Sequence, residues 1–117
     1  MKYLLLIYFD ESWGKLSLAE RRQVYAGQTE LAQELTTRGQ YLGGHPLHPT
    51  SSATTVRVRE GKRLLTDGPF AETREHLGGY MLIDVENLDE AIAIAARGPV
   101  ASVGTVEVRP VREGPPT

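Results

Sequence analysis

The sequence predicts an α+β fold of the ferredoxin-like kind, in which two helices cover one face of an antiparallel sheet. Three observations support this prediction. Segments 3–9 and 80–85 carry apolar side chains at odd and even positions alike, which is typical of interior strands. Helix-start signals precede segments 18–38 and 88–97. Each of these helices lies between predicted strands, and helices that connect strands in this order favour a ferredoxin-like sheet.

Length and composition limit both the organisation and the function. The 117 residues suffice for one domain with a single core, and we expect this domain to cover 1–117 with a frayed tail at 113–117. The formal net charge of −2 argues against a nucleic-acid-binding surface. The chain has no cysteine, which excludes a disulfide framework, and we expect a cytoplasmic protein. The apolar run 3–9 is too short for a membrane span, which needs about 20 residues.

The first strand, 3–9, carries apolar side chains on both of its faces. Both faces therefore need to be covered by other elements. One face carries Tyr3, Leu5, Ile7 and Phe9, and the other carries Leu4, Leu6 and Tyr8. Trp13 is expected in the loop that follows. Ser17 and Glu20 then have the spacing of a capping box, which starts a helix that Gly39 ends.

Gln28 is the polar member of the apolar stripe on this helix. The stripe recurs at helical spacing and consists of Val24, Gln28, Leu31 and Leu35. A glutamine at the boundary of a core can be satisfied by water or by backbone groups. The alternative is that its amide points into a cleft and contacts a ligand.

The middle of the chain is predicted as an edge strand followed by a hairpin. Residues 40–47 contain two glycines and a proline, which are typical of an edge or bulged strand. Segment 54–59 alternates an apolar face with a basic face. A turn at 60–62 leads into a returning strand at 63–66, so the two strands form a small hairpin.

The corner after this hairpin, residues 67–70, restricts the backbone conformation more than an ordinary turn does. Pro69 lacks a backbone N–H and restricts Gly68, which can itself adopt φ values that other residues avoid. The Asp67 carboxylate can accept hydrogen bonds from backbone amides, as an Asx turn or as the cap of a short helical turn over 71–75. The corner is therefore either structural or a site at which Asp67 and Phe70 meet a ligand.

The second half of the chain repeats the pattern of the first. A capping signal at 87–90 follows the strand 80–85 and starts the second helix, which Gly98 and the following proline end. In the last strand, 105–111, Val106 and Val108 are expected to point inward, and Glu107 and Arg109 outward. The predicted apolar stripe of the second helix consists of Leu88, Ala91, Ile92 and Ala95.

Two helices can cover only one face of the sheet, while segments 3–9 and 80–85 are apolar on both faces. An uncovered second face would be a large apolar patch, which soluble monomers rarely carry. The sequence therefore predicts a homodimer in which two sheets pack face to face and close a shared α/β barrel.

Several motifs together resemble the DGPF branch of the YCII-related proteins. They are Lys2–Tyr8, Thr66–Thr73, Leu77–Tyr80, Leu82–Val85, Leu88–Ala91 and Val106–Pro110. The match covers nearly the whole chain. The Asp-Gly-Pro-Phe tetrapeptide, taken together with its flanking residues, is specific for this family. The resemblance implies a dimeric α+β barrel with a cleft between sheet and helices. It also implies a genetic link in bacteria to extracytoplasmic-function sigma factors, and no settled biochemical activity.

The wider YCII group is thought to use a His on the first helix and an Asp after the second helix as a catalytic pair. With segments 41–46 and 95–99 as anchors, the resemblance places these positions at Gln28 and Gly98. An amide does not titrate near neutral pH, and a glycine has no side chain to orient a base. The acid–base chemistry of the pair is therefore not expected here, although Gln28 is still expected to face the cleft.

The three histidines are further candidates. His45 and His48 flank Pro46, but spacing supplies no third ligand, so no metal site is predicted. His76 could act as an acid or base together with Asp67, or it could be a solvated residue at the start of a strand. No glycine-rich loop precedes a helix, so neither a nucleotide nor another cofactor is predicted.

Two functions from different classes remain open. The first is a small-molecule-binding or regulatory accessory module linked to a sigma-factor system, with Gln28, His45, Asp67, Phe70 and Tyr80 around the cleft. The second is an enzyme of unknown reaction in which Asp67 is the acid or base and His76 or His45 assists. Because the His–Asp pair is missing, the sequence favours binding over catalysis. We expect neither a nucleic-acid nor a membrane partner.

Overall fold

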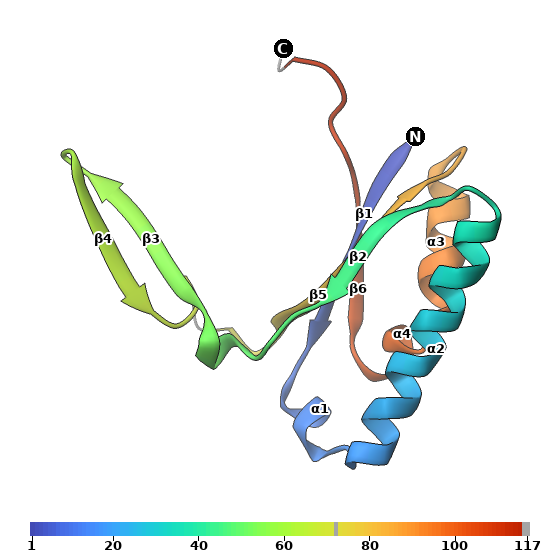
Figure 1. Ribbon diagram of the computed structural model, residues 1–117, viewed down its shortest axis with the longest axis horizontal. Helices are drawn as coiled ribbons and strands as arrows, with labels where there is room; N and C mark the ends of the chain where they lie inside the picture. The colour runs from blue at the N-terminus through green and yellow to red at the C-terminus, as the bar shows by residue number, and fades with distance from the viewer. Residues whose placement is uncertain (72, 116–117) are drawn as a thin grey trace.

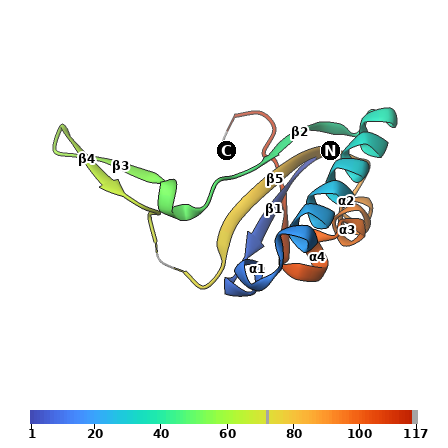
Figure 2. The same cartoon turned by 60° about the horizontal axis from the view of Figure 1, so that its bottom comes forward.

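The computed structural model describes residues 1–71 and 73–115 and has the expected α+β class (Figure 1). Four strands form an antiparallel sheet in the order β2-β5-β1-β6, and β3 pairs with β4 in a separate hairpin. Helices α2 and α3 lie on one side of the larger sheet (Figure 2). The elements, in chain order, are β1 (Lys2–Phe9), α1 (Glu11–Lys15), α2 (Leu18–Thr37), β2 (Tyr41–Pro46), the 3-10 turn η1 (Thr50–Ser52), β3 (Thr54–Arg59), β4 (Lys62–Asp67), β5 (His76–Asp84), α3 (Leu88–Arg97), α4 (Val100–Val103) and β6 (Thr105–Pro110).

The core lies between the helices and one face of the two central strands. β1 and β5 are interior strands, as their doubly apolar sequences predict. Alternation along each strand sends one set of side chains toward the helices and leaves the other set half exposed. The buried set, with its partners from the helices, consists of Tyr3, Leu5, Ile7, Phe9, Met81, Ile83, Val24, Leu31, Leu35, Ala91 and Ile94. The half-exposed set consists of Leu4, Leu6, Tyr8, Tyr80 and Leu82.

The first helix has the predicted capping box and the predicted stripe. The Ser17 hydroxyl accepts from the backbone N–H of Glu20 at 3.1 Å, and the Glu20 carboxylate accepts from the backbone N–H of Ser17 at 3.0 Å. Hydrogen bonds from the backbone N–H of Ser17, and then from its side chain, lower the pKa of the Glu20 carboxyl. Within α2 the stripe residues Val24, Leu31 and Leu35 are buried, and Gln28 is partly buried between them.

The predicted stripe on the second helix is wrong in part. Leu88 and Ile92 are about half exposed, at 47% and 49%, and Ile94 is buried in their place. The reason is that the chain continues past Gly98 into α4, which packs Val100 into the same cluster as Ile94. The covered face of α3 is therefore rotated toward the side on which α4 lies.

Two loop predictions also differ from the structure. Trp13 lies in the short helix α1, whose N-cap Asp10 accepts a hydrogen bond from the backbone N–H of Ser12 at 2.8 Å. The Trp13 ring stacks on Phe9, with 4.1 Å between ring centroids, so an aromatic contact holds this segment against the core. The helical turn expected over 71–75 is absent from residues 71 and 73–75, and its remaining residue lies outside the described part of the chain.

The β3–β4 hairpin projects away from the rest of the molecule (Figure 1). Its base depends on the backbone of Gly68, which has a φ of +100°, a value that favours glycine. The Gly68 N–H donates to the carbonyl oxygen of Ala53 at 2.7 Å, and the Thr55 hydroxyl donates to the carbonyl oxygen of Gly68 at 2.8 Å. The exposed large apolar side chains of the hairpin are Val56, Val58, Leu64 and Leu65.

The last strand, β6, ends at Pro110. Residues 113–115 of the expected frayed tail belong to no helix or strand, and residues 116–117 lie outside the described part. Within that part, no helix combines the length and the apolar character that crossing a membrane requires.

Gly104 is expected to be essential to the junction between α4 and β6. A Cβ atom at this position would lie 2.3 Å from the carbonyl oxygen of Tyr8 and 2.9 Å from a ring carbon of Phe9. Because the first of these atoms belongs to the backbone, Gly104→Ala should lower the free energy of unfolding by about 1–3 kcal/mol, as overpacking does. Urea denaturation followed by circular dichroism measures this change.

Gly14→Ala is the matched control for this substitution. Gly14 lies inside α1, and apart from its chain neighbours and the backbone of that helix no described atom comes within 4 Å of the position that its Cβ would take. Alanine is preferred over glycine in a helix by about 0.8–1 kcal/mol, so this variant should be as stable as the wild type or more stable. Equal stability of the two variants would contradict the close packing at Gly104.

Candidate functional site

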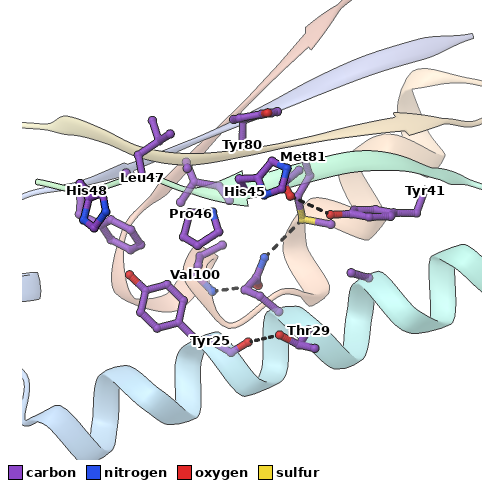
Figure 3. A pocket seen from close by; sticks show the side chains of 17 residues that line it. Tyr25, Thr29, Tyr41, His45, Pro46, Leu47, His48, Tyr80, Met81 and Val100 are labelled. Atoms are coloured by element: carbon purple, nitrogen blue, oxygen red, sulfur yellow. Dashed lines mark hydrogen bonds between the residues drawn. The ribbon is translucent and has the colours of Figure 1, made fainter. Parts of the chain in front are cut away.

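A cavity of about 640 Å³ opens between α2 and the strands β2 and β5 (Figure 3). The helix contributes Tyr25, Gln28, Thr29 and Ala32, and the strands contribute residues of the segments 41–48 and 78–81. No Asp, Glu, Lys or Arg is among the described residues that line it. A concave, largely apolar space with a few polar groups is the usual form of a site for a small molecule.

Gln28 is the polar group at the deep side of this cavity. Its Nε2 donates to the Met81 sulfur at 3.5 Å, and its Oε1 accepts from the backbone N–H of Val100 at 3.4 Å. Both contacts are weak, because sulfur is a poor acceptor and 3.4 Å is long for an N–H···O hydrogen bond. The amide is therefore held in place without strong partners, and a ligand could compete for it.

The structure brings Gln28 and Gly98 together, although they are far apart in the sequence. A Cβ atom on Gly98 would lie 2.3 Å from the Gln28 Oε1 and 3.1 Å from the Gln28 Cδ. Gly98 is buried at the C-cap of α3, with a φ of −71° that any residue can adopt. Its lack of a side chain is thus explained by the space that the Gln28 amide occupies rather than by backbone strain.

Close approach of β2 to β5 shapes the wall opposite the helix. A Cβ atom on Gly44 would lie 2.5 Å from the Tyr80 carbonyl oxygen, so only glycine fits at this point of the bulged strand β2. The Tyr41 hydroxyl donates to the carbonyl oxygen of Gly44 at 3.3 Å. Burial, and then the neighbouring Tyr80, raise the pKa of the Tyr41 phenol, so this hydroxyl keeps its proton and stays a neutral donor.

A second cavity of about 350 Å³ adjoins the first near the start of α2. The two cavities share lining residues, so we treat them as two compartments of one cleft. The shared residues are Phe9, Tyr25, Leu47, His48 and Gly78.

The predicted site residues fall into three places. Gln28 and His45 line the first cavity, and His76 lines the second. Tyr80 also borders the first cavity, but its ring lies on the opposite side of β5 from Met81 (Figure 3). The His45 ring meets the Tyr80 ring edge to face at a centroid distance of 6.2 Å, so both residues stand at the rim.

Asp67 and Phe70 lie apart from the cleft within one copy of the chain. Asp67 ends β4, and neither residue lines the two compartments. Phe70 is 74% exposed, and the Arg57 guanidinium lies 4.9 Å from its ring centroid. No hydrogen bond to the Asp67 carboxylate comes from residues 1–71 or 73–115, so the predicted capping role has no described partner.

Several lining residues were not found from the sequence. Tyr25 and Ala32 stand three residues before and four residues after Gln28, and Thr29 stands four residues after Tyr25, so all three lie on the cavity side of α2. Their helical spacing was the signal that could have identified them. Tyr41 gave no such signal, because its place in the cavity depends on how β2 pairs with β5.

No three His, Cys, Asp or Glu side chains within residues 1–71 and 73–115 are grouped so that they could hold a metal ion. The polar groups of the first cavity are instead amide, hydroxyl and imidazole groups, which suit hydrogen bonding to an organic molecule.

The fold and the cleft define a small α+β domain with helices on one sheet face and a cavity beneath α2. The family model of the YCII-related domain matches residues 1–114, and the chain therefore belongs to the YCII-related family. The chain is also 37% identical over 126 aligned residues to "Uncharacterized protein R00369" of Rhizobium meliloti (strain 1021), with 95% of this chain and 92% of that protein covered. The family expected from the sequence motifs is confirmed.

The contact between Gln28 and Gly98 is expected to appear as an energetic coupling. Gly98→Ala displaces the Gln28 amide from the Val100 N–H, so it should cost on the order of 1 kcal/mol of unfolding free energy. In a Gln28→Ala background the added methyl group meets free space, and the cost should fall close to zero. A double-mutant cycle measured by urea denaturation gives the coupling energy.

Gln33→Ala is the control background, because Gln33 lies on the exposed side of the same helix. In that background the cost of Gly98→Ala should be unchanged. An identical cost in all three backgrounds would show that Gln28 does not occupy the space beside Gly98.

Proposed function

We propose that this YCII-related chain is a small-molecule-binding module whose ligand occupies the cavity beneath α2, with Gln28 as the main polar contact. The observation that carries this proposal is the Gln28 amide, which lines a cavity of about 640 Å³ and whose contacts within the described residues are a 3.4 Å hydrogen bond from the Val100 N–H and a 3.5 Å contact with the Met81 sulfur, a poor acceptor. Tyr25, Thr29 and Tyr41 supply further hydroxyl groups around the same space.

The chemistry of the amide supports binding rather than proton transfer. Glutamine offers two N–H donors and one acceptor oxygen, and it does not exchange a proton near neutral pH. A ligand with a polar edge would replace the weak contacts of Gln28 by stronger hydrogen bonds while its apolar part displaces water from the cavity. A role as a regulatory accessory module beside an extracytoplasmic-function sigma factor belongs to this proposal through the family resemblance.

The enzyme alternative assigns the acid–base role to Asp67, with His76 or His45 as its assistant. In one copy of the chain, Asp67 lies on the projecting hairpin, His76 in the second compartment and His45 at the rim of the first. General acid–base groups must lie within hydrogen-bonding reach of one substrate. No observation therefore favours this alternative.

Ligand binding is expected to depend on Gln28 without involving turnover. In thermal-shift measurements against a panel of neutral metabolites, a ligand at about 100 times its dissociation constant should stabilise the wild type by about 2.7 kcal/mol. Gln28→Leu keeps the size of the side chain and removes its polar atoms, so the shift should become smaller. Gln33→Leu, on the exposed side of α2, should respond as the wild type does.

Two outcomes would count against this function. One is the absence of any stabilising compound in the panel. The other is turnover of ester or thioester substrates by the wild type that Gln28→Ala abolishes, because an amide that only binds cannot account for it.

We further propose that two copies form a homodimer through the uncovered face of the larger sheet. Leu4 and Leu6 of β1 lie opposite Leu82 and Tyr80 of β5, so a continuous half-exposed apolar strip crosses this face. On β6 the neighbouring positions are Glu107 and Arg109, whose side chains form an ion pair with each other. Two such faces could meet without burying an unpaired charge at this edge.

The projecting hairpin adds a second surface that requires cover. Its strands expose Val56 and Leu65, at 57% and 64%, on the same face of the hairpin. Residues 54–67 hold four Lys and Arg and two Asp and Glu, a net charge of +2, while the whole chain carries −2. The remainder of the chain therefore carries −4, and a second copy is an electrostatically favourable surface for the hairpin.

Dimer formation through the sheet face is expected to be sensitive to Leu6. Size-exclusion chromatography with light scattering should give twice the chain mass for the wild type and the mass of one chain for Leu6→Glu, because a charge would be buried without a partner. Ile92→Glu, a similar change at a half-exposed site on α3, should remain a dimer. A monomeric wild type at micromolar concentration would rule out this assembly.

A further inference from the structure

The second compartment of the cleft differs from the first in its charge. Arg21 and Arg22 line it, and the acidic residue among its described lining is Asp10. The Asp10 carboxylate already accepts hydrogen bonds from the N–H and the hydroxyl of Ser12, which lower the pKa of this carboxyl. The compartment thus holds two permanent positive charges and one negative charge, in a protein whose net charge is −2.

The two arginines have no acidic partner within the described residues. Neither Arg21 nor Arg22 takes part in the ion pairs there, in contrast to Arg38, Arg97 and Arg109. The Nε atom of Arg21 is also buried from solvent, and none of the described residues provides a hydrogen-bond acceptor for it. A buried N–H group of a guanidinium that lacks an acceptor costs free energy, and rotation of the Arg21 side chain toward an anion in the compartment would remove that cost.

Aromatic side chains form the apolar side of the same compartment. The Trp13 ring stacks on Phe9 and meets the ring of Tyr25 edge to face at a centroid distance of 5.6 Å. Phe9 and Tyr25 also line the first compartment, where the described lining residues include no Asp, Glu, Lys or Arg. A ligand whose anionic end lies at the arginines can therefore extend its apolar part past these rings into the uncharged space.

We infer that the cleft binds a small organic carboxylate with an apolar or aromatic body, its carboxylate at Arg21 and Arg22 and its body in the cavity beneath α2. This inference rests on the proposed binding function and adds the chemical class of the ligand. Arginine suits this role because its planar group can hold a carboxylate through two parallel hydrogen bonds. His48 and His76, which also line the compartment, are further donors or acceptors beside the anion.

The test compares two probes that differ only in their head group, 4-phenylbutyrate and 4-phenylbutan-1-ol. Isothermal titration calorimetry on the wild-type protein at neutral pH should give an affinity for the carboxylate about tenfold or more above that for the alcohol. This factor corresponds to one charge-assisted hydrogen bond retained in a partly buried site. The alcohol measures the apolar compartment alone.

Three variants locate the preference. Arg21→Met keeps the apolar stem and removes the charge, so it should reduce the preference for the carboxylate to about twofold or less while leaving alcohol binding within about twofold of the wild type. Arg21→Lys retains a charge without the planar group and should keep part of the preference. Arg38→Met makes the same change of net charge at the C-terminal end of α2, outside both compartments, and should behave as the wild type does.

The outcomes separate this inference from the binding function on which it rests. If both probes bind equally to the wild type, the carboxylate site is overturned and the apolar cavity stands. The same holds if Arg21→Met and Arg38→Met, both folded by circular dichroism, keep an equal preference. If neither probe binds, the inference and the proposed function both fail.

Discussion

The packing of α2 against the buried face of β1 and β5 is the contact on which the rest of the structure depends. Val24, Leu31 and Leu35 press into the layer of side chains that includes Ile7 and Met81. This apolar packing is interrupted at Gln28, the polar member of the stripe. An amide buried in a core without polar partners would cost free energy. The cavity opens at this interruption, so the element that builds the core also creates the site.

Gln28 and Gly98, the positions at which the sequence resemblance places the wider family's His–Asp pair, are neighbours in the structure. The missing side chain at 98 gives room to the amide at 28. The two residues therefore share one space, because a side chain at 98 would overlap the amide at 28. The polar group that Gln28 presents to the cavity is an amide, which does not titrate near neutral pH.

Two surfaces of the isolated chain remain apolar and uncovered, namely the outer face of the sheet and the β3–β4 hairpin. The base of the hairpin is held by Gly68, which has a positive φ and donates a hydrogen bond to the carbonyl oxygen of Ala53. Within one copy of the chain, Asp67 and Phe70 line neither compartment of the cleft, which separates the corner motif from the cavity beneath α2.

The sequence by itself determined the α+β class, the two interior strands, the edge strand, the hairpin and both capping signals, because alternation and capping depend on residues close together in the chain. It also singled out Gln28, whose polarity breaks a local periodic pattern. The packed face of α3 was decided only by the tertiary structure, since Ile92 and Ile94 both fit a helical stripe until α4 covers one side. For the same reason, the sequence alone did not predict that Gln28 lies beside Gly98 or that Arg21 lines a pocket with aromatic residues. Contacts between distant segments depend on how sheet and helices pack, and no local pattern records that.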